Sequence, residues 1–148
     1  MSHENTPVLR SSTTAKGEQK HTKEDIIFGE ECYKIIDCAF IPICREKLLG
    51  YGFLEKVYKN GLFIELIDKG FQAEKEYPIK VFYKGKVIGE YFADIVVDRK
   101  IILELKAEEK LNLIHQAQII NYLKASKIKV GLLINFGKKK CEFKRFIY

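Results

Sequence analysis

Two stretches near the middle of the chain decide the fold: YFADIVV at residues 91–97 and IILELK at residues 101–106. Both are rich in β-branched and large apolar side chains, which favour strands. The polar triplet Asp98-Arg99-Lys100 separates them, so we predict a β-hairpin. The second stretch is apolar on both faces, as expected of a strand that helices cover from two sides.

Hydrophobic periodicity extends this centre in both directions along the chain. It predicts helices at 23–49, 53–69 and 108–127, and strands at 77–83, 87–97, 101–106, 130–135 and 141–148. Thr22 is the predicted N-cap of the first helix, and Pro42 should kink or break that helix. A helix that connects the third strand to the fourth makes those two strands parallel. The expected class is α/β, with a mixed central sheet flanked by helices.

Asp94 and Glu104 are unusual because each is a charged residue within an apolar strand. Burying a carboxylate without a partner is costly. The two positions are centred on Arg99, so a three-residue loop would set them opposite each other, with Cβ atoms roughly 5 Å apart. Lys106 would then project from the same face as Glu104. A two-residue loop would send Glu104 to the other face, and the apolar pattern does not choose between these registers.

A divalent cation would relieve the repulsion between two facing carboxylates. Oxygen ligands from Asp94, Glu104 and the backbone carbonyl of Leu105 suit Mg²⁺ or Mn²⁺, and Lys106 could position a water molecule or stabilise negative charge. This chemistry predicts phosphodiester hydrolysis. The structural alternative is a partly buried salt-bridge cluster without catalytic function.

The net charge of +6 is modest, but basic residues gather in the last quarter of the chain. Such a cluster can neutralise phosphates, although a solvated lysine-rich face would have the same composition. The predicted nucleic-acid-binding residues are Lys138, Lys139, Lys140, Lys144 and Arg145.

The length of 148 residues and the apolar content of 47% suggest one domain, at 24–148. Residues 1–23 are poor in large apolar side chains, so we expect them to form a flexible tail. No stretch has the length and apolar character of a signal peptide or membrane span, so we expect a soluble, cytoplasmic protein. Cys32, Cys38, Cys44 and Cys141 lack zinc-site spacing, and we interpret them as small buried residues in a reducing compartment.

Several motifs in order carry a resemblance to a known family. Asp94 followed by Glu104-Leu105-Lys106 is similar to the PD-(D/E)xK nuclease signature, with Ala93 in place of the proline. GFLEKVY at 52–58 resembles the motif that names the GxxExxY proteins of that superfamily. HQAQIINY at 115–122 and VGLLINFG at 130–137 are similar to later segments, and the match extends over about residues 25–136. The segment before Gly50 departs from relatives, which commonly have a Val-His pair there.

The resemblance implies a restriction-endonuclease-like fold, an αβββαβ core with an extra N-terminal helix. It also implies that Glu55 joins the metal site and that Gln118 orients the lysine, the water or the phosphate. Taken from the residues alone, Glu55 could equally be a first-turn carboxylate favoured by the helix dipole. A stripe of Leu111, His115, Gln118 and Tyr122 on the third helix supports the placement of Gln118 independently.

The prediction is a metal-dependent nuclease that acts on nucleic acid, with DNA as the preferred substrate, and a homodimer is left open. One alternative is a nucleic-acid-binding or scaffold protein that keeps the fold with little catalysis. Another is a metal-dependent phosphoesterase for small molecules, which the basic C-terminal quarter disfavours.

Overall fold

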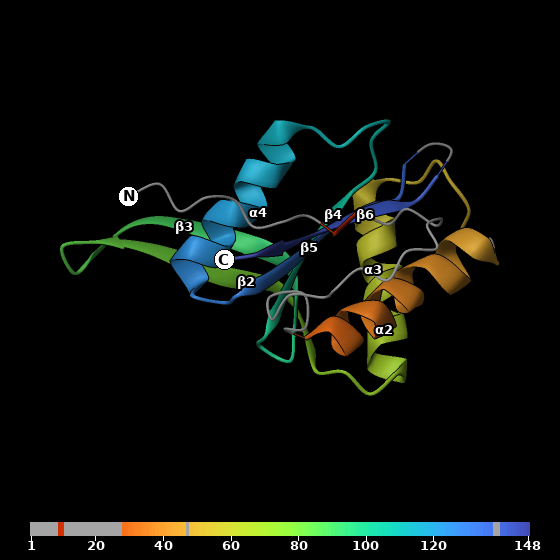
Figure 1. Ribbon diagram of the computed structural model, residues 1–148, viewed down its shortest axis with the longest axis horizontal. Coiled ribbons are helices and arrows are strands. Elements are labelled where there is room, and N and C mark those ends of the chain that lie inside the picture. Colours follow the sequence, from red (N-terminus) through yellow and green to blue (C-terminus); the bar gives the residue numbers. More distant parts are fainter. Residues whose placement is uncertain (1–8, 11–27, 47, 138–139) are drawn as a thin grey trace, which may run out of the picture.

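The computed structural model describes residues 9–10, 28–46, 48–137 and 140–148, and these build a central sheet with helices on both faces (Figure 1). The strand order is β1-β6-β5-β4-β3-β2. β4 (Ile101–Lys106) and β5 (Val130–Asn135) lie at the centre and are parallel. The neighbouring pairs are antiparallel, so the sheet is mixed as predicted.

The sheet divides the hydrophobic core into two layers, and helices cover each of them. On one face α2 (Gly29–Ala39) and α3 (Glu55–Asp68) pack over apolar side chains that include Leu103, Leu105 and Phe136. On the other face α4 (Leu113–Ser126) packs over residues such as Ile102, Leu133 and Phe146. α4 approaches β5 closely, since a Cβ on Gly131 would lie 2.8 Å from the Ile119 side chain. The alternation of strand residues thus supplies both layers from the same central strands.

The helix boundaries correct parts of the sequence prediction. The first predicted helix is α2 followed by a π-helical segment, η1 (Phe40–Arg45), which contains Pro42. The proposed cap Thr22 and residues 23–27 lie outside the described residues. The third predicted helix begins at Leu113 rather than 108, because the Asn112 side chain accepts hydrogen bonds from the backbone N–H groups of Ile114 and His115.

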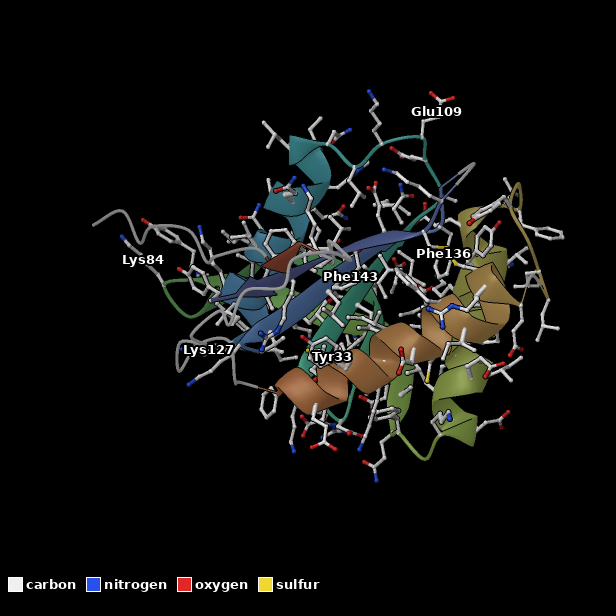
Figure 2. The ribbon with its side chains drawn as sticks, turned by 45° about the vertical axis from the view of Figure 1, so that its right-hand side comes forward. Tyr33, Lys84, Glu109, Lys127, Phe136 and Phe143 are labelled. Carbon is white, nitrogen blue, oxygen red and sulfur yellow. A yellow bond between two sulfur atoms is a disulfide. The ribbon has the colours of Figure 1, made fainter. Side chains whose placement is uncertain are left out.

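β2 (Ala73–Tyr83) and β3 (Lys86–Val97) form a long hairpin whose end extends away from the rest of the molecule (Figure 1). Lys84 marks its tip in Figure 2, whereas Phe136 lies between the sheet and α3. β2 starts earlier than predicted, and pairing skips Glu76, which has a positive φ of 51°. The last strand, β6 (Glu142–Ile147), pairs with β5.

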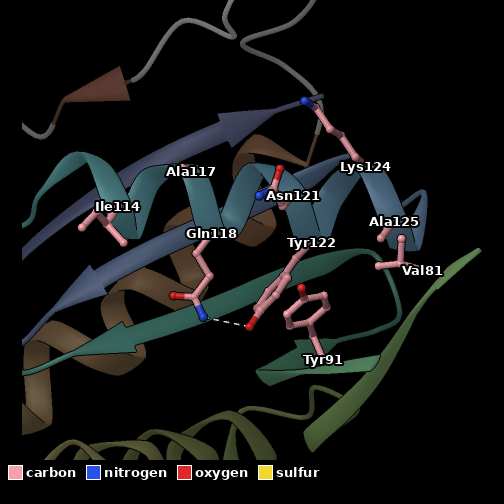
Figure 3. Close-up of a pocket in the computed structure, with 9 residues that line it drawn as sticks. All are labelled: Val81, Tyr91, Ile114, Ala117, Gln118, Asn121, Tyr122, Lys124 and Ala125. Atoms are coloured by element: carbon pink, nitrogen blue, oxygen red, sulfur yellow. Dashed lines mark hydrogen bonds between the residues drawn. The ribbon is translucent and has the colours of Figure 1, made fainter. Parts of the chain in front are cut away.

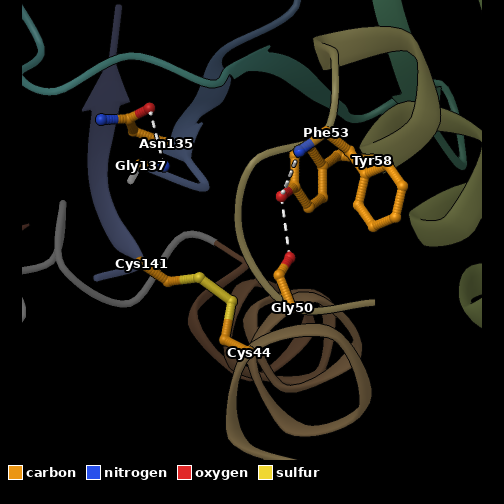
Figure 4. The surroundings of a disulfide bond; sticks show 7 residues. All are labelled: Cys44, Gly50, Phe53, Tyr58, Asn135, Gly137 and Cys141. Atoms are coloured by element: carbon orange, nitrogen blue, oxygen red, sulfur yellow. Dashed lines mark hydrogen bonds between the residues drawn. A yellow bond between two sulfur atoms is a disulfide. The ribbon is translucent and has the colours of Figure 1, made fainter. Parts of the chain in front are cut away.

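Two findings concern the chain ends and the cysteines. Leu9–Arg10 form a short strand, β1, against β6, so this part of the predicted tail belongs to the sheet. Cys44 and Cys141 form a disulfide that links η1 to the loop before β6 (Figure 4), which corrects the prediction that all four cysteines are buried thiols. Cys32 and Cys38 are free and buried, as expected.

In the described part of the chain, no helix has both the length and the apolar character needed to cross a membrane.

Candidate active site

The candidate site lies where β3 and β4 stop pairing. Their ladder runs through Val97–Ile101, Val96–Ile102 and Ile95–Leu103, which is the register of a three-residue loop. The next pair in this register is Asp94 and Glu104, and their side chains replace the backbone ladder. The backbone N–H of Asp94 donates to Glu104 Oε1 at 3.0 Å, and that of Leu105 donates to Asp94 Oδ2 at 2.8 Å. Each carboxylate is therefore held by the opposite strand, and the two acids converge as expected for a three-residue loop, the register that the sequence had left open.

Burial and like charge make this pair electrostatically strained. Glu104 is only 3% exposed. Burial raises its pKa to about 8, and the neighbouring negative charge of Asp94 contributes in the same direction. The charge of Lys106 opposes this shift without cancelling it, so additional positive charge would stabilise the ionised pair.

Lys106 and Glu55 extend the cluster. The Nζ atom of Lys106 lies 3.9 Å from Glu55 Oε1, and the lysine side chain is largely buried whereas the glutamate is partly exposed. Burial raises the pKa of Glu55, Lys106 opposes this shift, and Asp94 adds to it. Glu55 is therefore close enough to Asp94 and Lys106 for both of their charges to affect its pKa.

Lys59 is a site residue that the sequence reasoning missed. It follows Glu55 by one turn of α3, and its Nζ atom lies 3.6 Å from Asp94 Oδ1. The same ammonium group also contacts the carboxylate of Glu76. Burial alone would lower the pKa of Lys59, but its hydrogen bond to Glu76 and the charge of Asp94 outweigh burial and raise it. The available signal was the four-residue spacing from Glu55, which places both side chains on one helix face.

The start of α3 is fixed by Tyr58, the last residue of the GFLEKVY motif. Its hydroxyl donates to the carbonyl of Gly50 at 2.8 Å and accepts from the N–H of Phe53 at 3.2 Å (Figure 4). Its ring is fully buried and stacks on Phe136, with centroids 4.6 Å apart. Gly52 has a φ of 102°, which a residue with a side chain rarely adopts. The motif therefore shapes the loop that presents Glu55.

α4 borders the site with Gln118 and Tyr122. The Gln118 amide donates to the Tyr122 hydroxyl at 2.8 Å (Figure 3). Burial raises the pKa of Tyr122, the Gln118 hydrogen bond opposes the shift, and the charges of Glu104 and Asp94 add to it. Tyr122 is therefore close enough to the acid pair for its pKa to respond to their charge, and Gln118 is hydrogen-bonded to Tyr122.

The other two residues of the predicted stripe, His115 and Leu111, have different structural roles. His115 belongs to the capping box, and its Nε2 atom lies 3.3 Å from Glu108. Leu111 precedes the helix and packs at the edge of the core. Leu113 and Ala117 are exposed, whereas Ile119 and Leu123 are buried against the sheet.

The described basic residues among those predicted to bind nucleic acid are divided between exposed and buried positions. Lys138 and Lys139 lie outside the described residues. Lys140 is exposed and lies 4.0 Å from Glu142. Lys144 and Arg145 are adjacent in β6 and point to opposite faces, and Arg145 is only 3% exposed, close enough to Cys32 to affect its pKa. Arg145 is therefore placed as a buried structural residue and not as part of an exposed nucleic-acid surface.

The donor set at the strand opening suits a hard divalent cation. Two carboxylates of like charge lie together at a buried position, and oxygen ligands are those that Mg²⁺ and Mn²⁺ prefer. Among the described residues, no three Asp, Glu, His or Cys side chains form a ready-made cage. Backbone carbonyl, water or phosphate oxygens would have to complete the coordination, which is the usual situation for Mg²⁺.

Comparison with protein families agrees with this geometry. A profile of the PD-(D/E)XK nuclease superfamily matches residues 29–146, from the start of α2 to β6. The chain belongs to this superfamily. The match includes the opened hairpin and the three flanking helices α2, α3 and α4, so the acid pair lies within the matched region.

The crystal structure of SSO0001 is similar, with a TM-score of 0.52 and 21% sequence identity. The similarity covers 81% of this chain and 59% of SSO0001, so this chain spans little more than half the length of that protein. At this identity the likeness supports the restriction-endonuclease-like fold alone. Among curated proteins, no sequence matches this chain significantly.

Proposed function

We propose that this chain hydrolyses phosphodiester bonds in nucleic acid, with DNA as the preferred substrate, in a reaction that requires Mg²⁺ or Mn²⁺. The observation that carries the proposal is the strand opening, at which Asp94 and Glu104 each accept a hydrogen bond from the opposite strand. A salt-bridge cluster alone would not explain why a carboxylate is kept at a position that raises its pKa to about 8. We retain the GxxExxY assignment on the motif at 52–58.

Asp94, Glu104 and the Leu105 carbonyl would hold the cation, with Glu55 joining directly or through water. When bound, such an ion polarises a phosphate and lowers the pKa of water. Lys106 would position the attacking water or stabilise developing negative charge, because its ammonium group is largely buried beside Glu55. Lys59 would orient Asp94 and balance its charge.

Gln118 would orient the phosphate or the water once substrate competes for its hydrogen bond to Tyr122. Lys140 and Lys144, with Lys138 and Lys139, would contribute phosphate contacts outside the site. Pairing of two copies to cut both strands of a duplex stays a prediction.

The test is cleavage of labelled single-stranded, duplex and branched DNA and of RNA, with Mg²⁺, Mn²⁺ or EDTA. We expect cleavage that needs the metal and that falls by at least about a hundredfold in Lys106→Ala, since positioned charge of this kind contributes on that order. Lys100→Ala, on the exposed turn, is the matched lysine control. Metal-dependent cleavage that is undiminished in Lys106→Ala would indicate a contaminant or a different site. Binding without cleavage would favour the scaffold alternative.

A further inference from the structure

A groove of about 620 Å³ lies between α4 and the β2–β3 hairpin (Figure 3). Its volume is in the range of small-ligand sites. Tyr91 and Val81 line it from the hairpin, and Gln118, Asn121 and Tyr122 line it from α4. The groove is therefore built from the hairpin and from the helix that borders the candidate site.

Tyr122 connects the groove to the acid pair. The rings of Tyr91 and Tyr122 have centroids 5.7 Å apart, and the Tyr122 hydroxyl accepts from Gln118. Tyr122 is also near enough to Glu104 and Asp94 for their charges to affect its pKa. A strand whose phosphate lies at the carboxylates could thus place an adjacent nucleotide in the groove.

The chemistry of the lining matches a nucleobase. Tyr91 is 51% exposed, which leaves much of its side chain accessible for stacking. Gln118 and Asn121 carry amides that can donate to and accept from a base edge. Lys124 lines the same groove, and its ammonium group lies 5.5 Å from the centroid of the Tyr148 ring. Aromatic, amide and cationic groups in one groove are characteristic of single-strand recognition.

The rest of the hairpin continues this character outward from the groove. Tyr83, on the same face of the hairpin as Val81 and Tyr91, is 61% exposed and pairs with Lys86, and Lys84 follows it in the turn. Aromatic rings interleaved with lysines can track an unpaired strand, whereas the bases of a duplex are stacked on each other and offer no free faces. Exposed aromatic side chains next to lysines are therefore better suited to contact a nucleic acid than an uncharged partner.

We propose that the groove between α4 and the β2–β3 hairpin binds an unstacked nucleobase adjacent to the scissile phosphate, so that the substrate is single-stranded or locally unpaired nucleic acid. The proposal rests on the proposed hydrolytic function and adds the substrate class. Tyr91 stacks on the base, and Asn121 hydrogen-bonds to its edge.

The test measures binding by fluorescence anisotropy in EDTA, so that cleavage does not enter. The probes are a short labelled single strand of mixed sequence and the duplex of the same sequence. We expect tighter binding of the single strand, a loss of about tenfold in Tyr91→Ala and near-normal binding in Tyr91→Phe, which keeps the ring. Tyr33→Ala is the matched control, because Tyr33 is 61% exposed on α2, on the other face of the sheet (Figure 2).

Equal single-strand affinity in Tyr91→Ala and the unaltered protein would overturn the proposal, as would an equal loss for both probes. A groove that accepts a second copy of the chain would instead show self-association that Tyr91→Ala abolishes without a change in oligonucleotide binding, and this result also overturns it. Circular dichroism confirms that each variant is folded. Cleavage with Mg²⁺ is measured separately. Binding that depends on Tyr91, without cleavage, would refute the hydrolytic function and support the nucleobase groove. Cleavage together with binding that Tyr91→Ala does not change would support the hydrolytic function and refute the nucleobase groove.

Discussion

Replacing Glu104 by glutamine should stabilise the metal-free protein at high pH. The carboxyl group has a pKa of about 8 in the folded protein, compared with an ordinary value of 4.5. Below pH 4.5 it is protonated in both folded and unfolded states and does not affect stability. As the pH rises toward 8, the unfolded chain ionises first, so stability falls by about 1.4 kcal/mol for each pH unit.

The ionised Glu104 therefore costs the folded state on the order of 4 kcal/mol at pH 8 when no metal is bound. Glutamine is uncharged and keeps an oxygen that can accept from the Asp94 N–H, the contact that Glu104 makes at 3.0 Å. Since the amide introduces a donor that needs its own partner, we expect about half of this cost to be recovered, or about 2 kcal/mol.

The assay is urea unfolding in EDTA, followed by circular dichroism because the chain has no tryptophan. The stability difference between Glu104→Gln and the unaltered protein should be about 2 kcal/mol at pH 8 and close to zero at pH 4. Glu90→Gln, at an exposed site on β3, should show no such difference. Added Mg²⁺ should stabilise the unaltered protein more than the variant, because the carboxylate is a proposed ligand. A variant that is less stable at pH 8, or equally stabilised at both pH values, would refute the electrostatic argument.

Three further changes test other parts of the fold. Tyr58→Phe removes the hydroxyl that holds the loop before α3, so it should cost about 1–2 kcal/mol in urea unfolding and lower cleavage beyond what the lost stability explains; full activity would contradict this role. Replacing Cys44 and Cys141 together by serine opens a loop with a sequence separation of 97, and we expect a loss of about 2–4 kcal/mol under oxidising conditions, with no loss relative to the reduced parent; an unchanged midpoint would argue against the bond. Gly131→Ala should cost about 1–3 kcal/mol, because the new Cβ would lie 2.8 Å from Ile119; a neutral effect would mean that α4 can shift away from β5.

The central strands were predictable because their residues are apolar on both faces and are bounded by clear breakers. β4 and β5 have the predicted bounds, and the parallel pairing follows from the helix between them. The register of β3 and β4 was left open by the apolar pattern, and the structure resolves it in favour of the three-residue loop.

The features that the sequence did not predict depend either on tertiary contacts or on the balance between N-capping and helix propensity at one helix start. Lys59 looked like an ordinary helix lysine, because nothing in its neighbourhood in the sequence places Asp94 beside it. The start of α4 was set too early because the capping role of Asn112 outweighs the helix propensity of the residues before it. The disulfide joins cysteines far apart in sequence, and spacing alone does not reveal such a pair.

The hydrogen bond from the Leu105 backbone to Asp94 also provides a reporter of the site. The amide proton of this residue shares its acceptor with whatever the carboxylate binds, so its NMR chemical shift should move when a cation binds. The neighbouring Leu103 amide, which belongs to the regular part of the hairpin, serves as an internal reference. One isotope-labelled sample could then follow metal occupancy residue by residue, independently of any substrate.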